Sequence, residues 1–262
     1  MKVTKRAVIK TPIQFILLIT ALNLSSISKA EQVQINSGAA IQESTNCWPA
    51  PNTKLAQFII GYGSLMEEQS KRKASTQVGE NYPIYLKGFK RGWIEQGNTR
   101  SGFGITFLGI EKDPSAKINA VYYKLDYPKA IYDYDKRENI YCRVKVSPSQ
   151  IMPLSSEKIP SGEYWIYFTK ASRVNRPSPE KPLFQSYVDL FLSGCFELEE
   201  KYHLENFAEN CIKTTHYWSD IWINDRAKPR TGLGNIDYSS KIDHLLAAKL
   251  PLLFKQIKIE KK

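Results

Sequence analysis

The stretch Phe58–Met66 constrains the fold of this chain more than any other, because a short apolar run leads directly into a glycine-containing loop. The apolar residues favour a buried strand, and Gly61, Gly63 and Ser64 interrupt the pattern at its end. Glycine lets a backbone approach a ligand closely, and successive free N–H groups form a concave anion site. The stretch therefore predicts a strand ending in a small-molecule cradle, with a purely structural glycine turn as the alternative.

Short strand signals dominate the middle of the chain. They combine β-branched and aromatic residues and are separated by Gly, Pro or Asn in turns. The predicted strands are Phe58–Tyr62, Tyr82–Phe89, Gly92–Glu95, Phe103–Ile110, Ile118–Leu125, Ile140–Val146 and Glu163–Phe168.

Helices are predicted between and after these strands. Asp126 is expected to cap a short helix that has Pro128 in its first turn and ends near Lys136. Apolar spacing predicts three more helices, at about residues 183–198, 204–214 and 241–254. Trp93, Trp165, Trp218 and Trp222 are interpreted as core residues. Strands in the middle followed by helices indicate one α+β domain over residues 55–262.

The first thirty residues are expected to be an export signal rather than part of the fold. Their basic start comprises Lys2, Lys5, Arg6 and Lys10. The apolar run Ile13–Leu24 is short for a bilayer span, and small residues at Ser28 and Ala30 predict cleavage after Ala30. We therefore expect a periplasmic or secreted protein with a loose polar leader at residues 31–54 and no stable membrane anchor. An uncleaved anchor is the alternative.

Charge gives little information about partners. The formal net charge of +11 falls to about +6 when the five Lys and Arg of the signal are removed. The remaining cations are scattered, and the clusters Lys71–Lys73 and Lys261–Lys262 are expected at the solvated surface. No nucleic-acid partner is predicted.

The four cysteines, Cys47, Cys142, Cys195 and Cys211, all follow the expected signal, and an even number in an exported protein permits disulfides. Cys195 and Cys211 flank a predicted helix–helix connection and are favoured as a pair. Cys142 lies in an apolar strand and is interpreted as a core residue. Neither the cysteines nor the three histidines have the spacing of a metal site.

A second motif, Asp135–Tyr141, follows the predicted short helix. It places Glu138 where that helix gives way to a strand, a position from which a side chain can be directed into a cavity. Alone, Glu138 is typical of a solvated charge at a helix end. Together with the cradle it indicates a small-molecule site with a carboxylate base.

In this order, the two motifs resemble the gamma-glutamylcyclotransferase superfamily, most of all its bacterial and glutathione-degrading branches. The likeness is carried by the loop Tyr62–Leu65 after a strand and by Arg137-Glu138-x-x-Tyr141. Further similarity lies in Gly102–Leu108, Asn119–Tyr122, Gln185–Leu190, Gly194–Cys195 and Trp222–Arg226. The implied fold is a small mixed β-barrel of about six or seven strands flanked by helices, with a helical C-terminal part at about residues 183–255.

The resemblance implies an enzyme that cleaves a γ-glutamyl amide by intramolecular aminolysis and releases 5-oxoproline. Glu138 matches the family's catalytic glutamate and is expected to act as general acid and base. The expected substrate-binding residues are Gly61, Tyr62, Gly63, Ser64, Leu65, Arg137 and Tyr141. Arg137 either binds a substrate carboxylate or pairs with a neighbouring acid, and both readings stay open. The implied partner is a small γ-glutamyl substrate such as glutathione or a γ-glutamyl peptide, and no cofactor or metal is implied.

Two other functions fit parts of the pattern. A non-catalytic exported module could use the same cradle to bind a γ-glutamyl or amino-acid ligand. A serine hydrolase would use Ser64, but the sequence around it lacks the Gly-x-Ser-x-Gly elbow and no histidine follows at a suitable place.

Overall fold

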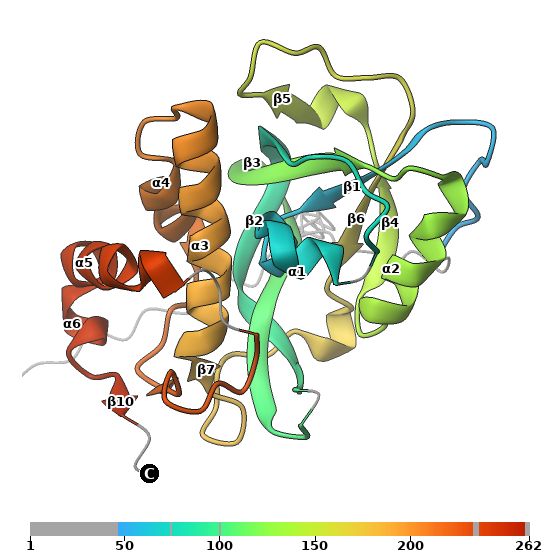
Figure 1. The fold of residues 1–262 in the computed structure, drawn as a ribbon. Helices are drawn as coiled ribbons and strands as arrows, with labels where there is room; N and C mark the ends of the chain where they lie inside the picture. Colours follow the sequence, from blue (N-terminus) through green and yellow to red (C-terminus); the bar gives the residue numbers. More distant parts are fainter. Residues whose placement is uncertain (1–46, 74, 100, 233–235, 260–262) are drawn as a thin grey trace, which may run out of the picture. The chain divides into compact units, whose positions relative to one another are not determined.

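The computed structural model describes residues 47–73, 75–99, 101–232 and 236–259, which fall within one compact unit of the chain, Ile41–Lys262 (Figure 1). The expected export signal and residues 31–46 of the expected leader lie outside the described residues. No helix within those described ranges has the length and apolar character needed to cross a membrane.

A curled mixed sheet forms the centre of this unit, as the α+β half-barrel that Figure 1 shows. Its seven strands run in the order β4-β6-β1-β3-β2-β5, with β8 paired to β2. The strands are β1 (Gln57–Gly61), β2 (Tyr82–Asn98), β3 (Gly104–Lys124), β4 (Cys142–Val146), β5 (Ile151–Pro153), β6 (Glu163–Phe168) and β8 (Thr215–His216). Strand β1 lies between β6, to which it is parallel, and β3, to which it is antiparallel. This sheet confirms the mixed, barrel-like fold expected from the sequence.

Strands β2 and β3 are each one long strand where the sequence predicts two. The register of β2 against β3 shifts between Lys87 and Phe89 and again between Trp93 and Glu95. Gly88 lies at the first of these shifts and has a φ of +85°, a conformation that glycine adopts without steric cost. Such bulges bend a strand without ending it, so local sequence signals of a turn appear inside a continuous strand.

Helices cover the sheet on more than one side (Figure 1). They are α1 (Glu68–Arg72), α2 (Ile131–Arg137), α3 (Gln185–Tyr202), α4 (Phe207–Lys213), α5 (Ser239–Lys249) and α6 (Pro251–Phe254). Short 3-10 helices span Ser64–Met66, Pro128–Ala130, Pro148–Gln150, Ala171–Arg173 and Ile236–Tyr238. A second, three-stranded sheet consists of β7 (Leu183–Phe184), β9 (Trp222–Asn224) and β10 (Lys258–Ile259).

Several helix boundaries differ from the sequence-based prediction. Leu183 pairs with Trp222 in the small sheet, so α3 begins two residues later than expected. Pro251 divides the last predicted helix into α5 and α6, because proline lacks the N–H that a continuous helix needs. Asp126 caps no helix: Tyr127 occupies the N-cap of the 3-10 turn that precedes α2, and this turn has no side-chain cap.

The aromatic core contains the tryptophans expected there. Trp93, Trp165 and Trp222 are fully buried, and Trp218 is partly buried and stacks on Trp222 with ring centroids 5.4 Å apart. Burial of large apolar side chains such as these contributes strongly to the hydrophobic driving force of folding.

Two disulfides connect the cysteines. Cys195 joins Cys211, the favoured pair, whereas Cys142 joins Cys47 rather than being an unpaired core residue. The partner of Cys142 lies 95 positions earlier, which is why the pattern around Cys142 alone suggested simple burial. Residues 47–54 are also held to the domain by a hydrogen bond from the Asn52 N–H to Glu163 Oε2 (2.7 Å).

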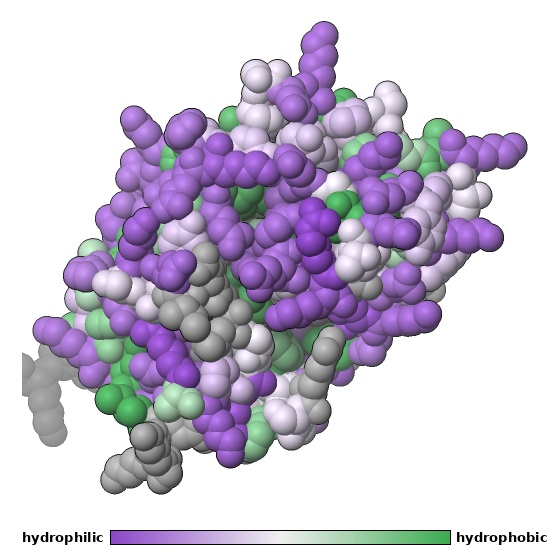
Figure 2. Space-filling model, viewed as in Figure 1, coloured by the Kyte–Doolittle hydropathy of each residue, from purple (hydrophilic) through white to green (hydrophobic). Residues whose placement is uncertain are grey.

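The face shown in Figure 2 is mainly hydrophilic, with apolar side chains in scattered patches. Lys71 does not belong to this solvated surface, contrary to the prediction for the cluster Lys71–Lys73. Its side chain is 0% exposed and its Nζ donates to Gly79 O and to Glu68 Oε2, each at 2.8 Å. The ammonium also lies 5.0 Å from the ring centroid of Tyr123, so hydrogen bonds and a cation–π contact compensate its burial.

Candidate active site

The loop after β1 is fixed by close packing on both sides. A Cβ added to Gly61 would lie 2.9 Å from Leu65 Cβ, so the absence of a side chain at Gly61 lets the loop fold back on itself. A Cβ added to Gly194, in α3, would lie 2.5 Å from the Glu67 N atom. Gly61 and Gly194 are therefore needed for the close approach of the loop to the strand and to α3.

A buried arginine, Arg91, is hydrogen-bonded to the start of the loop. The Nη1 of Arg91 donates to Tyr62 O (3.0 Å) and to Asn119 O (2.9 Å), and its Nη2 donates to Cys211 O (3.0 Å). Burial lowers the pKa of Arg91 to about 9. The guanidinium thus links the start of the loop to β3 and to the disulfide-bonded helix α4.

Glu138 lies at the junction predicted for it, as the C-cap of α2. Its N–H donates to Tyr134 O (2.8 Å) and its own carbonyl accepts from the Tyr141 N–H (2.9 Å), so backbone bonds fix the residue on both sides. The side chain of Glu138 is 14% exposed to solvent. Burial raises the pKa of the Glu138 carboxyl, and the neighbouring Arg137 guanidinium opposes this shift.

Arg137 connects the acid to the loop. Its Nε lies 2.9 Å from Glu138 Oε1, and its Nη2 donates to Ser64 Oγ (3.3 Å) and Ser70 Oγ (3.0 Å). Nη1 donates in addition to Ser70 O. Of the two roles left open for Arg137, these contacts favour pairing with the neighbouring acid.

Glu138 and the loop line one small pocket of about 30 Å³. Its lining comprises Ile60, Tyr62, Gly63, Ser64, Leu65, Leu108, Glu138, Tyr141, Tyr167 and Tyr187. The Tyr62 hydroxyl donates to Tyr167 O (2.6 Å) and the Tyr141 hydroxyl to Leu108 O (2.7 Å), which fixes two walls. Burial raises the pKa of all four phenols in this pocket, so they stay protonated near neutral pH.

The structure brings most of the predicted site residues together. Tyr62, Gly63, Ser64, Leu65, Glu138 and Tyr141 line the small pocket, and Arg137 lines the larger cleft beside it. Gly61 lines neither, and its place in β1 against Leu65 indicates a structural role. The sequence-based prediction of the site did not include Leu108, Tyr167 or Tyr187. Tyr187 lies within the helix predicted at about residues 183–198 from apolar spacing, a pattern that indicates packing rather than a site.

The small pocket adjoins a cleft of about 680 Å³. The two share Ser64, Glu138, Tyr141 and Tyr187. The other residues of the cleft are Ser70, Lys73, Asn98, Thr99, Phe107, Lys136, Arg137, Asn139, Ile140, Leu190, Arg230, Thr231 and Gly232. A cleft of this size accommodates a ligand considerably larger than the small pocket alone.

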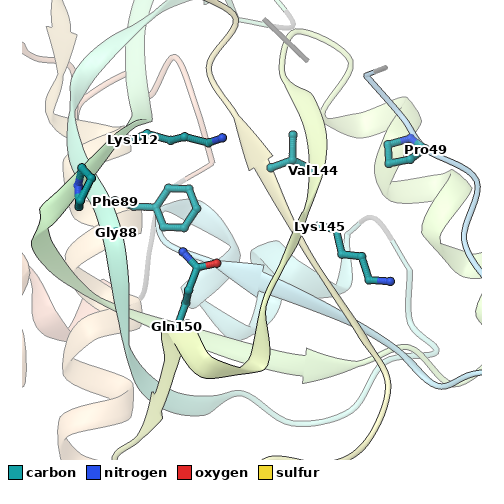
Figure 3. Close-up of a pocket in the computed structure, with 8 residues that line it drawn as sticks. Pro49, Gly88, Phe89, Lys112, Val144, Lys145 and Gln150 are labelled. Carbon is teal, nitrogen blue, oxygen red and sulfur yellow. The ribbon is translucent and has the colours of Figure 1, made fainter. Parts of the chain in front are cut away.

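A separate cavity of about 430 Å³ shares no residue with this site. Figure 3 shows Phe89 and Val144 facing it, with Lys112 extending toward Val144 and Lys145 pointing away. No acidic side chain is among its described lining residues, so it offers no carboxylate base.

The arrangement around Glu138 suits proton transfer to and from a bound molecule. A carboxyl whose pKa is raised by burial is a stronger base once it is ionised. First-turn N–H groups such as those at Ser64 and Leu65 have no partner within their own helix. Ser64 Oγ is contacted by a guanidinium, and the described lining contains no histidine to activate it. This geometry does not support a serine nucleophile.

Comparison with solved structures finds proteins of similar fold. A gamma-glutamyl cyclotransferase aligns with 72% of this chain and 99% of its own at 12% identity and a TM-score of 0.47. An uncharacterized human protein aligns with 71% of this chain and 98% of its own at 13% identity and a TM-score of 0.45. A yeast gamma-glutamyl cyclotransferase specific to glutathione aligns with 63% of this chain and 99% of its own at 12% identity and a TM-score of 0.35.

Two of these three structures bear the name of the family that the sequence motifs resemble. No family model matches the sequence, and no curated protein matches it. The likeness concerns the fold, so the function has to be inferred from the side chains of the site.

Proposed function

We propose that this protein cleaves a γ-glutamyl amide by intramolecular aminolysis, releasing 5-oxoproline and the free amine. The observation that carries the proposal is the shared pocket of Glu138 and the loop Tyr62–Leu65. A carboxylate base on one side and backbone donors on the other are the two groups that this reaction requires.

Glu138 acts as the base in the first step. Its carboxylate takes a proton from the substrate's α-ammonium, and the resulting amine attacks the γ-carbonyl carbon. Both reacting groups belong to one molecule, so holding them in a near-attack pose supplies a large share of the acceleration. The new C–N bond closes a five-membered ring and places negative charge on the former carbonyl oxygen.

The loop stabilises that charge. The N–H groups of residues 63–65 lie at the N-cap and in the first turn of the 3-10 helix that follows β1. One well-placed donor can stabilise an oxyanion by about 3–4 kcal/mol. When the intermediate collapses, the original amide C–N bond breaks. The protonated Glu138 then gives its proton to the leaving amine, so the carboxylate is regenerated. The excess proton of the ring nitrogen follows through the same carboxylate to the freed amine, so 5-oxoproline leaves as a lactam and the amine as an ammonium ion.

The proposal is tested by measuring 5-oxoproline released from glutathione and a panel of γ-glutamyl amino acids by residues 31–262. Glu138→Gln keeps the size and polarity of the side chain but removes the base. We expect turnover to fall by at least about a hundredfold, while the melting temperature stays close to that of the wild type. Unchanged turnover in Glu138→Gln would exclude Glu138 as the base.

If the folded wild type turns over none of these substrates, the proposed enzymatic activity is contradicted and a non-catalytic binding module is favoured. The second arm of the experiment is therefore calorimetric titration of the same panel into Glu138→Gln. A module of that kind binds without releasing 5-oxoproline.

We also propose that the protein works outside the cytoplasm, in the periplasm or as a secreted protein. Two disulfides support this, because such bonds persist mainly in oxidising compartments. Fractionation of cells producing the full chain, with N-terminal sequencing of the mature form, tests both the location and cleavage after Ala30.

A further inference from the structure

We infer that an apolar platform of Phe107 and Ile140 selects γ-glutamyl amides whose amine portion carries an apolar side chain. This inference rests on the proposed function, since it concerns the part of the substrate that is released as the amine. It assigns a specificity role to two residues that line the cleft and that take no part in the proposed reaction.

The place of the amine portion follows from how the small pocket and the cleft adjoin. Glu138 and the loop Tyr62–Leu65 line the small pocket, whose volume of about 30 Å³ is too small for a whole substrate. The cleft shares Glu138, Tyr141 and Tyr187 with that pocket. An amine portion attached to the γ-carbonyl therefore has to extend past these side chains into the cleft.

Phe107 lies at the border between the two cavities. It belongs to β3, and the residue after it, Leu108, lines the small pocket. The Phe107 ring packs edge-on against the ring of Tyr187, with centroids 5.1 Å apart and planes at 77°. Because Phe107 is only partly buried and lines the cleft, part of its apolar ring is open to a ligand there.

Ile140 lies beside Phe107, although it comes from a different segment. It stands two residues after Glu138 and directly before Tyr141, in the connection between α2 and β4. A Cβ added to Gly97 of β2 would lie 3.1 Å from Phe107 Cε2 and 3.5 Å from Ile140 Cδ1. The two side chains therefore flank the same point, and the absence of a side chain at Gly97 leaves room for both.

A third apolar side chain comes from α3. Leu190 is buried and lines the cleft, and it follows Tyr187 by three positions, which places both residues on one face of the helix. Three segments that are far apart in the sequence thus line this part of the cleft with apolar side chains. Because packing against Tyr187 and across Gly97 holds Phe107 and Ile140 in place, the platform is formed before a ligand binds.

An apolar platform at this place discriminates between side chains by removing them from water. An apolar side chain of the amine portion loses hydrated surface when it lies on Phe107 and Ile140, which is favourable. A polar side chain of the same shape would lose hydrogen bonds to water, and neither platform side chain can replace them. The platform therefore favours leucine, methionine or phenylalanine in the amine portion over asparagine or serine.

The experiment compares γ-glutamyl-leucine with γ-glutamyl-asparagine, which have equal net charge and side chains of nearly the same shape. The measured quantity is 5-oxoproline release by residues 31–262, expressed as the ratio of the two kcat/KM values. We expect the wild type to favour the leucine compound by roughly five- to twentyfold, the effect of partly burying a leucine side chain.

Ile140→Asn and Ile140→Leu form a matched pair of variants. Asparagine removes the apolar surface and should lower the ratio toward one, whereas leucine keeps that surface and should keep the preference. Phe107→Asn should also lower the ratio; if that variant does not fold, the Ile140 pair still decides the question. Ile159→Asn is the control, because Ile159 is likewise partly buried but is not among the described residues of the cleft. Its ratio should equal that of the wild type.

Binding separates this inference from the proposed reaction. Calorimetric titration of both compounds into Glu138→Gln needs no turnover, and tighter binding of γ-glutamyl-leucine would support the platform even if the wild type released no 5-oxoproline. Equal affinities, equal kcat/KM values in the wild type, or no binding of either compound would overturn the inference. Efficient release from both compounds at equal rates would leave the proposed reaction standing without it.

Discussion

The Nε of Arg137 lies 2.9 Å from Oε1 of the residue that follows it, Glu138. The same guanidinium donates to Ser64 Oγ in the loop after β1 (3.3 Å). One side chain therefore sets the charge environment of the proposed base and its position relative to the proposed cradle.

Replacement of Arg137 by glutamine should move the acid limb of the pH–rate profile to higher pH. A general base works as the carboxylate, so activity falls as pH drops through its pKa. Burial raises the pKa of Glu138 and the Arg137 cation opposes that shift, so loss of the cation lets the pKa rise further. The measurement is kcat/KM against pH for both proteins. An acid limb at the same pH would contradict the electrostatic role of Arg137.

Replacement of Gly194 by alanine should destabilise the protein and reduce turnover together. The new Cβ would lie 2.5 Å from Glu67 N and 2.6 Å from Met66 C, so α3 and the loop must separate. Overpacking of this kind costs about 1–3 kcal/mol. Urea unfolding and kcat/KM check both effects. Helix propensity alone favours alanine by about 1 kcal/mol, so a more stable variant would show that this contact is not tight.

The two disulfides should differ in their contribution to stability. Cys47 and Cys142 are separated by 95 positions, Cys195 and Cys211 by 16. Chain entropy predicts losses of about 4–5 and about 3 kcal/mol, respectively, because a longer loop restricts the unfolded chain more. Double-alanine variants of each pair, unfolded in urea, test the order. The reverse order would mean that local packing around Cys195 and Cys211 outweighs chain entropy.

Glu95 should make stability depend on pH. Its side chain is 0% exposed and its Oε1 lies 2.6 Å from Arg173 Nε. Burial outweighs the attraction of Arg173 and raises the pKa of Glu95 to about 7, whereas an unfolded glutamate titrates near about 4.3. Between these values the folded state binds the extra proton, so this group's contribution to stability is largest below the unfolded pKa and is lost as pH rises through about 7.

Glu95→Gln lacks this titration. Its melting temperature relative to the wild type should therefore increase from pH 5 to pH 8, as followed by circular dichroism. A constant difference across that range would contradict the raised pKa.

Some of the site follows from local sequence alone. The apolar run before Gly61 predicts a buried strand, and the helix predicted to end near Lys136 ends at Arg137, with Glu138 next to it. Both signals lie within a few residues of the feature they determine. The loop and Glu138 could therefore be placed at strand and helix ends before any tertiary contact was known.

Other parts depend on contacts that no local pattern records. Tyr62 donates to the carbonyl of Tyr167, 105 positions away, and both side chains become walls of the same pocket. Lys71 was predicted to be a surface charge because of its charged neighbours. It is buried, and its ammonium donates to Gly79 O and lies over the ring of Tyr123. In each case the partner is supplied by a distant segment, which a short-range signal does not specify.

The sequence by itself determined a mixed α+β domain, a glycine-containing loop after its first strand, and an acid at the end of a short helix, because strand and helix periodicity and turn residues are local physical properties. The tertiary structure decided that Arg137 faces Glu138, that Tyr187 lines the pocket rather than only packing, and that Arg230 reaches the cleft from the C-terminal helical part. These outcomes follow from how curled strands and helices bring distant residues together, and that depends on packing of the whole core.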